Sequence, residues 1–254
     1  MNDPSTCDDG HRRLDPSDLP AGPPLHLERP GACARHLSPF LEPRRIERMS
    51  DVLGRRTRQL TALIEHVHDP HNLAACVRSC DAFGIQDLHI VPQAGARRVM
   101  VGRDVSRGAD RWLTVHYHDS TDRAVDALHA AGYRVAATDL DDNAPPTSIT
   151  ELSIREPWCI AFGNEHDGIS DTLRRRADLR VHIPMVGFVE SLNISVAFAV
   201  AMSHLRLRRD AALGEAGDLD AAARTDLLDR WIFADVPRAR AILEVVAERL
   251  GAAP

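Results

Sequence analysis

Alternating strand and helix patterns between residues 60 and 209 constrain the fold of this chain more than any other feature. Short apolar runs typical of buried strands occur at residues 60–67, 88–91, 113–116, 133–138, 158–162 and 181–183. Helical patterns over residues 72–83, 121–131 and 191–209 separate several of these runs, and Gly84 and Gly132 end the first two. Parallel strands need such crossover helices, so the pattern predicts an α/β fold with helices on both faces of a parallel sheet.

The two ends of the chain differ in composition from this core. Residues 1–43 hold eight of the 16 prolines, and seven acidic residues against four arginines. Such a segment buries too little apolar surface to offset the entropy of ordering, so we expect residues 1–43 to be a disordered acidic extension. The remaining chain divides into a domain over residues 44–209, beginning with an Arg-rich helix, and a helical extension over residues 210–254.

Charge and cysteine usage limit the possible partners and compartments. The net charge is −6, and all 31 basic residues are arginine, with clusters at residues 44–58, 97–111 and 174–176. Arginine clusters can clamp phosphates, although each alone is typical of a solvated face. The five cysteines form no CxxC pair, so we expect reduced thiols and no metal site. The chain lacks an apolar run of about 18 residues and a secretory signal, which favours a cytoplasmic protein without a membrane span.

Three short segments carry residues suited to chemistry. They read DPHNLAACVRSCDAFG at residues 69–84, FGNEHDGIS at 162–170 and IPMVGFVESLNISVAFAV at 183–200. In the third, a buried strand leads through a glycine-bearing loop into a helix, whose first N–H groups are available to a bound molecule. A single connection of this shape is common in α/β proteins, so the combination of the three segments is what carries information.

In this order, the three segments resemble the signature motifs of the SpoU/TrmH family of RNA ribose 2′-O-methyltransferases in the SPOUT superfamily. The resemblance extends over about residues 44–209. It implies S-adenosylmethionine as the methyl donor and a homodimer in which RNA-binding residues of one subunit lie beside the cofactor of the other. It also implies a deep C-terminal trefoil knot that builds the cofactor pocket. Periodicity alone favours an unknotted Rossmann-like sheet.

The resemblance assigns a cofactor site and a catalytic group. The cofactor residues are Thr138, Leu140, Gly163, Ile183, Met185, Ser191 and Leu192, and the catalytic group comprises Asn72, Arg78, Glu165, Ser191 and Asn193. In the family, the arginine matching Arg78 is catalytic. A guanidinium stays protonated in proteins, so Arg78 either works with an RNA phosphate that accepts the proton or remains cationic and stabilises the developing alkoxide. Ser191 or Asn193 could equally cap the helix that follows.

The expected substrate is RNA, recognised mainly through shape and phosphates. The predicted RNA contacts are Arg44, Arg45, Arg48, Arg55, Arg56 and Arg107. A catalytic core flanked by short terminal helices is most similar to the branch of the family that methylates guanosine 18 in the D-loop of tRNA. Methylation of ribosomal RNA and RNA binding without catalysis remain alternatives. A nucleotide-binding dehydrogenase is disfavoured because no GxGxxG follows the first strand.

Overall fold

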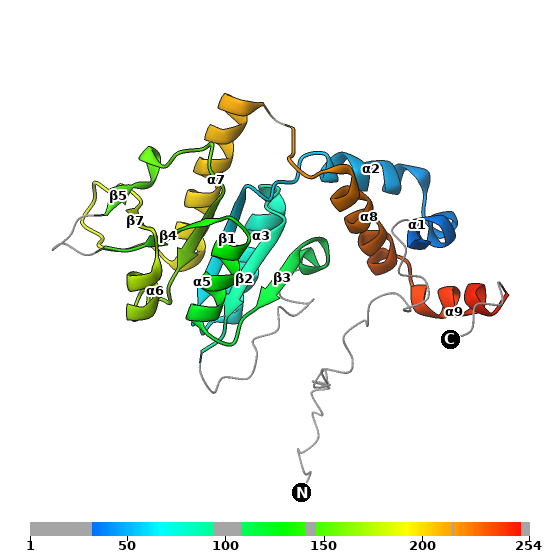
Figure 1. Ribbon diagram of the computed structural model, residues 1–254, viewed down its shortest axis with the longest axis horizontal. Coiled ribbons are helices and arrows are strands. Elements are labelled where there is room, and N and C mark those ends of the chain that lie inside the picture. The colour runs from blue at the N-terminus through cyan, green and yellow to red at the C-terminus, as the bar shows by residue number, and fades with distance from the viewer. Residues whose placement is uncertain (1–31, 94–107, 141–145, 215, 250–254) are drawn as a thin grey trace, which may run out of the picture.

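A seven-stranded sheet forms the centre of the protein (Figure 1). The computed structural model describes residues 32–93, 108–140, 146–214 and 216–249. Its strand order is β3-β2-β1-β6-β4-β7-β5, and every pair of neighbouring strands is parallel. The bounds are β1 (Leu60–Glu65), β2 (Asp87–Val91), β3 (Thr114–Tyr117), β4 (Arg134–Thr138), β5 (Thr147–Ser148), β6 (Trp158–Phe162) and β7 (Leu179–His182). The predicted parallel α/β sheet is confirmed, and only the two-residue β5 had no counterpart among the predicted strands.

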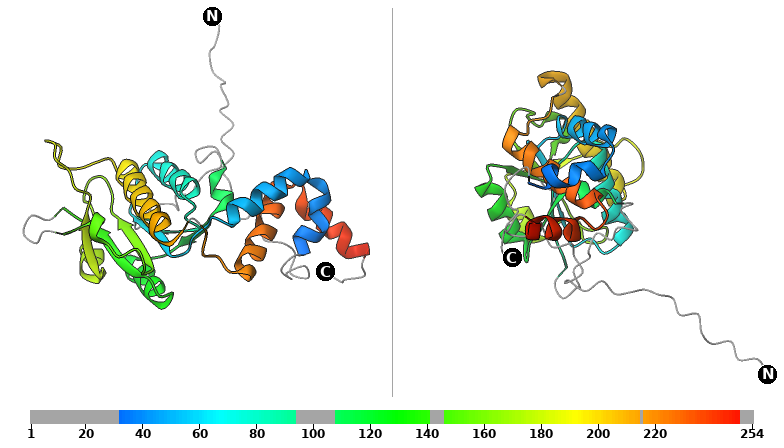
Figure 2. Two further views of the ribbon diagram at one scale, coloured as in Figure 1. Left: turned by 90° about the horizontal axis from the view of Figure 1, so that it is seen from above. Right: turned by 90° about the vertical axis from the view of Figure 1, so that its right-hand side faces the viewer.

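Helices cover both faces of the sheet (Figure 2, left). The helices α3 (Pro70–Ala82) and α7 (Ile194–Leu213) lie on one face, and α5 (Thr121–Ala130) and α6 (Asp171–Arg176) lie on the other. Successive strand residues point to opposite faces, so Ile64 of β1 packs in the α3 and α7 core while its neighbour Leu63 packs in the α5 and α6 core. This two-faced burial explains the nearly continuous apolar runs in the sequence.

The helix after β7 starts three residues later than predicted. We expected it to begin at Ser191, but α7 begins at Ile194. The cap is Asn193, whose side-chain oxygen accepts a hydrogen bond from the Ser195 backbone N–H at 2.8 Å. Of the two candidates for the capping role, Asn193 fills it, and Ser191 remains in the loop.

The terminal segments pack together into a helical unit beyond the β3 edge of the sheet (Figure 1). It comprises α1 (Ala32–Leu37), η3 (Ser38–Phe40), α2 (Pro43–Leu53), α8 (Ala221–Asp235) and α9 (Ala239–Arg249). The predicted disordered extension over residues 1–43 was therefore wrong from residue 32 onward, because Cys33 and Leu37 are buried against α8 and α9 residues such as Trp231 and Leu243. Residues 1–31 lie outside the described ranges. The expected C-terminal helices are present.

A backbone crossing joins this unit to the sheet. The Gly217 N–H donates to the carbonyl of Gly54, and the Asp218 N–H donates to that of Arg56 at 3.1 Å. A side chain at Gly217 would overlap the Arg56 backbone, so the two chains can cross this closely only at a glycine. Two further 3-10 helices are η4 (Ala109–Trp112) and η5 (Ile149–Glu151). Trp112 of η4 packs edge to face against Trp231 of α8, with 5.4 Å between the ring centroids.

None of the described helices is long and apolar enough to cross a lipid bilayer.

Candidate cofactor pocket and catalytic group

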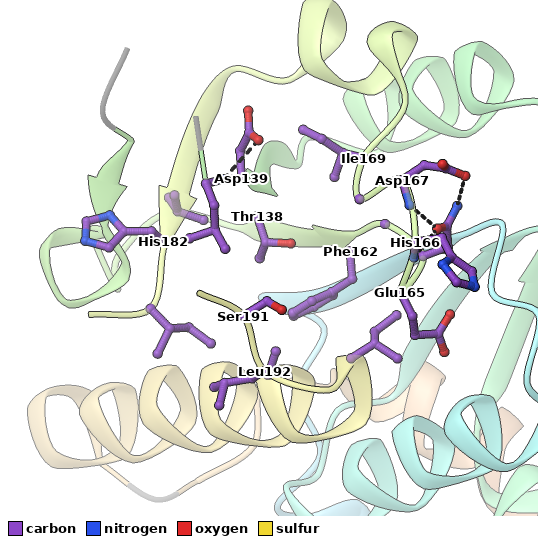
Figure 3. A pocket seen from close by; sticks show the side chains of 18 of the residues that line it. Thr138, Asp139, Phe162, Glu165, His166, Asp167, Ile169, His182, Ser191 and Leu192 are labelled. Carbon is purple, nitrogen blue, oxygen red and sulfur yellow. Dashed lines mark hydrogen bonds between the residues drawn. The ribbon is translucent and has the colours of Figure 1, made fainter. Parts of the chain in front are cut away.

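A pocket of about 320 Å³ opens at the carboxyl ends of three adjacent strands, β6, β4 and β7 (Figure 3). The segments that follow these strands form its walls together with the start of α7. Carboxyl ends of parallel strands are where α/β sheets bind ligands, since the connecting loops diverge there. All seven residues predicted to bind a cofactor line this pocket: Thr138, Leu140, Gly163, Ile183, Met185, Ser191 and Leu192.

Gly163 is required by the local backbone. It follows β6 and is buried. A side chain there would overlap the Gly168 carbonyl, because the Asn164 N–H donates to that carbonyl at 3.0 Å and closes the loop on itself. At Gly163 the neighbouring backbone of the same loop comes this close, and the contact sets the shape of the pocket wall.

Three of the predicted catalytic residues form a hydrogen-bonded chain at the edge of the pocket. The Asn72 side-chain amide donates to Glu165 Oε1 at 2.5 Å, and Asn193 Nδ2 donates to Asn72 Oδ1 at 3.3 Å. These side chains come from the N-terminal turn of α3, the loop after β6 and the cap of α7. Residues distant in sequence thus converge, and each amide both donates and accepts, which fixes its orientation.

Arg78 lies apart from this chain. It is exposed, and it lines a separate open hollow of about 560 Å³ with Ala75, Trp112 and Ala199. Its position six residues after Asn72 places it about 9 Å farther along α3. Neither Asp81 nor Glu165 pairs with it, since Asp81 pairs with Arg56 and Glu165 accepts a hydrogen bond from Asn72. Among the described residues of one chain, no hydrogen bond or ion pair joins Arg78 to Glu165 or Asn72.

The predicted RNA contacts differ in how far their charges are exposed and paired. Arg44, Arg48 and Arg55 are exposed, and none of them forms an ion pair within the described ranges. Arg45 is held by both carboxylate oxygens of Asp235, at 2.8 and 3.1 Å.

The prediction that Arg56 contacts RNA was wrong. Its side chain is fully buried, pairs with Asp81, donates to the Ile85 carbonyl at 3.2 Å and lies over the Trp231 ring. Burial lowers its pKa, and the charge of Asp81 opposes that shift. Arg107 lies outside the described ranges.

The third arginine cluster faces other side chains of the protein. Arg176 pairs with Asp122 and Asp126 on α5. Arg174 pairs with Asp139 and Asp171, and it lines the cofactor pocket. Arginine clusters can clamp phosphates, but the guanidinium groups of Arg174 and Arg176 are engaged by carboxylates of the protein, which does not favour RNA contact by this cluster.

Asp139 and Arg174 also line the pocket, although neither was predicted as a cofactor residue. The Asp139 side chain is 7% exposed and accepts hydrogen bonds from Arg174 Nε at 3.1 Å and Arg180 NH1 at 3.3 Å. Burial alone would raise the pKa of Asp139, but these arginines hold it below its usual value. Asp139 directly follows β4, which was the one available signal. Within the described ranges, no group of three His, Cys, Asp or Glu side chains is arranged to hold a metal ion.

Comparisons with known proteins agree with this geometry. Residues 59–203 match the SpoU rRNA Methylase family. The tRNA (guanosine(18)-2'-O)-methyltransferase of Thermus thermophilus is 36% identical over 189 residues, which are 74% of this chain and 95% of that protein. The solved TrmH/SpoU tRNA modifying enzyme of Aquifex aeolicus superposes with a TM-score of 0.69 at 26% identity, covering 77% of this chain and 98% of that one.

A second similar structure contains a ligand. The SpoU methyltransferase AviRb from Streptomyces viridochromogenes, solved in complex with the cofactor AdoMet, has a TM-score of 0.53 at 25% identity, covering 63% of this chain and 64% of that one. The family match spans more than half of the sequence and contains the pocket and the Glu165–Asn72–Asn193 chain. This chain therefore belongs to the SpoU methylase family.

Proposed function

We propose that this protein transfers a methyl group from S-adenosylmethionine to the ribose 2′-hydroxyl of guanosine 18 in tRNA. The observation that carries the proposal is the polar chain Glu165–Asn72–Asn193 at the edge of a pocket that all the predicted cofactor residues line. The activity of the Thermus relative, a tRNA (guanosine(18)-2'-O)-methyltransferase, supports the choice of tRNA and of this nucleotide. A tRNA substrate also implies a cytoplasmic place of action.

The residues of the pocket fit this cofactor. Leu140, Ile183, Met185 and Leu192 offer an apolar surface suited to an adenine, and Asp139, Glu165 and Arg174 offer charged groups suited to an amino acid. The AdoMet complex of AviRb supports the same assignment. When bound, the cofactor supplies an activated methyl group on a sulfonium. The trefoil knot implied by the family remains part of this proposal.

The protein groups contribute position and charge. Asn72 and Asn193 hold Glu165 in one orientation, so that its carboxylate can accept a hydrogen bond from a ribose hydroxyl. Arg78 carries a fixed positive charge that would stabilise the developing alkoxide while the 2′-hydroxyl releases its proton to solvent and takes the methyl group. A carboxylate and a guanidinium on opposite sides of the hydroxyl would together orient it toward the methyl group.

We also propose a homodimer that completes this site. Arg78 lies outside the cofactor pocket of its own chain. Val186 and Phe188, in the loop between pocket residues Met185 and Ser191, are fully exposed, and Val196 and Val200 of α7 are 47% and 44% exposed. Contiguous exposed apolar side chains are typical of a protein interface. Burying this surface against a second copy would bring the Arg78 of one chain toward the pocket of the other.

The RNA strand has a candidate path next to Arg78. The Arg78 hollow and a second hollow of about 440 Å³ share Asp81, Ala82 and Phe83, so they adjoin at the end of α3, and we propose that the RNA strand follows both as one groove. Arg48 and Arg55 of the α2 segment line the far part of this groove. They are exposed and carry no ion pair within the described ranges, which leaves their charges available to phosphates.

The proposal is tested by offering the purified protein labelled S-adenosylmethionine with an unmodified tRNA transcript or with ribosomal RNA. We expect label in the ribose of the D-loop guanosine. Arg78→Ala should lower the rate by roughly 100-fold or more while S-adenosylhomocysteine still binds. Label confined to ribosomal RNA would instead assign the other substrate, and binding of tRNA without methylation would favour the non-catalytic alternative.

A further inference from the structure

Arg174 is the single Arg or Lys among the described residues that line the cofactor pocket. Two contacts on one side hold its guanidinium against Asp139, at 3.1 Å from Nε to Oδ2 and 3.4 Å from NH2 to Oδ1. Asp139 is 7% exposed, and Arg180 supports it from the other side. This arrangement fixes the guanidinium in the pocket wall before any ligand arrives.

One further contact of Arg174, with Asp171, can be exchanged. Its NH1 donates to Asp171 at 3.1 Å, and the Asp171 side chain is 82% exposed. Exposed ion pairs between neighbouring helix residues contribute little, because water competes for both charges. A ligand carboxylate inside the pocket could therefore take the place of Asp171 on NH1 without disturbing the buried contact with Asp139.

The three arms of the sulfonium narrow the choice of ligand group. On the proposed function, the methyl arm points to the Glu165 side of the pocket, where Asn72 and Asn193 converge. The adenosyl arm takes the apolar wall of Leu140, Ile183, Met185 and Leu192. The amino-acid arm then needs a polar wall. Asp139 lies on a different side of the pocket from Glu165 (Figure 3), and Arg174 is bound to Asp139.

We propose that Arg174 binds the carboxylate of the amino-acid arm of S-adenosylmethionine, with Asp139 as the residue that positions it. A guanidinium presents two parallel N–H groups in the geometry that a carboxylate accepts. This inference rests on the proposed use of the cofactor. It goes beyond that proposal by naming the residue that makes the complete cofactor bind more tightly than fragments without the amino acid.

The test compares two ligands that differ only in that arm. S-adenosylhomocysteine carries the carboxylate, and 5′-methylthioadenosine keeps the adenine, ribose and sulfur but lacks it. Isothermal titration of the full chain without RNA gives both dissociation constants. For Arg174→Ala, we expect S-adenosylhomocysteine to bind at least about tenfold more weakly, as for a lost charge-assisted contact, and 5′-methylthioadenosine to bind within about twofold of wild type.

Two further variants make the result interpretable. Arg175→Ala removes the neighbouring charge of the same helix, which donates to Thr172, and should change the affinity for neither ligand. Arg174→Lys keeps the charge but not the two parallel N–H groups. It should lower the affinity for S-adenosylhomocysteine in part and leave that for 5′-methylthioadenosine unchanged.

If Arg174→Ala weakens the binding of both ligands equally, Arg174 only shapes the pocket. If it weakens the binding of neither ligand, Arg174 does not contact the ligand. Either result would overturn this inference. A wild-type protein that binds neither ligand would instead refute the proposed cofactor.

Discussion

Asn193 has two tasks that a pair of substitutions can separate. Its Oδ1 caps α7 by accepting from the Ser195 N–H, and its Nδ2 donates to Asn72. Asn193→Asp keeps the acceptor but loses the donor, so we expect a thermal midpoint close to wild type and a large loss of methyl transfer. Asn193→Ala loses both and should also cost about 1 kcal/mol of stability. Thermal unfolding and single-turnover rates check this, and an active Asn193→Asp protein would restrict Asn193 to capping.

His89 makes stability depend on pH. Its side chain is buried on β2, stacks on His116 and His118, and lies near Asp87, which pairs with Arg58. Burial, with the charges of His116 and His118, lowers its pKa from 6.5 to about 3. Between these values the unfolded chain binds a proton that the folded chain does not, so the stability contributed by His89 is full above pH 6.5 and falls as the pH drops.

For this one group, the free energy of unfolding changes by about 1.4 kcal/mol per pH unit. His89→Gln should remove that part of the slope between pH 6.5 and 4, as measured by urea unfolding of both proteins at several pH values. His118, whose pKa is also lowered by burial, contributes its own part in both proteins. Parallel curves for the two proteins would show that His89 is protonated in the folded state.

The sequence identified residues by type better than by location. Asn72, Glu165 and Asn193 were predicted together, and they meet because three predicted elements end at the same edge of the sheet. Arg56 was placed on the surface because an Arg-rich stretch does not reveal which member faces inward. Its partners Asp81 and Trp231 come from distant segments, so only the tertiary packing could identify it as buried.

At the scale of elements, the groove between α2, α3 and α7 predicts which arginines bind RNA. Arg48 and Arg55 line it, whereas Arg44 lies on the same helix as Arg48, is equally exposed and does not line it. We expect Arg48→Ala with Arg55→Ala to weaken tRNA binding and to reduce the slope of log affinity against log salt by roughly 0.7–0.9 per lost phosphate contact. Arg44→Ala is the matched control. Equal losses from all three positions would favour a diffuse basic surface over this groove.

Strands and long helices were predictable because burial on both faces leaves apolar runs and glycines end the helices. The elements that were missed have weaker signals. The helix α1 lies in a polar, proline-rich segment and is stabilised by contacts of Cys33 and Leu37 with α8 and α9, nearly 200 residues away. The helix α6 has only six residues, and its arginines resemble a surface cluster until their partners Asp122, Asp126 and Asp139 are located.

At the scale of the whole molecule, a composite active site predicts complementation between two inactive chains. Arg78→Ala keeps the pocket, and Leu192→Trp is designed to fill the pocket while keeping Arg78. If Arg78 serves the pocket of the partner, a mixed dimer has one working site. Random exchange makes about half of the dimers mixed, which restores about a quarter of the wild-type sites. If Arg78 serves its own pocket, mixing restores nothing. Rates measured before and after subunit exchange separate these outcomes.

The central claim is that the methyl group goes to one ribose hydroxyl of tRNA. It is tested most directly with two tRNA transcripts that differ by a single oxygen atom, one with guanosine and one with 2′-deoxyguanosine at position 18. We predict that labelled methyl groups enter the first transcript and not the second, while both bind the protein with similar affinity. Equal labelling of the two transcripts would contradict the account, because the accepting atom would then lie elsewhere.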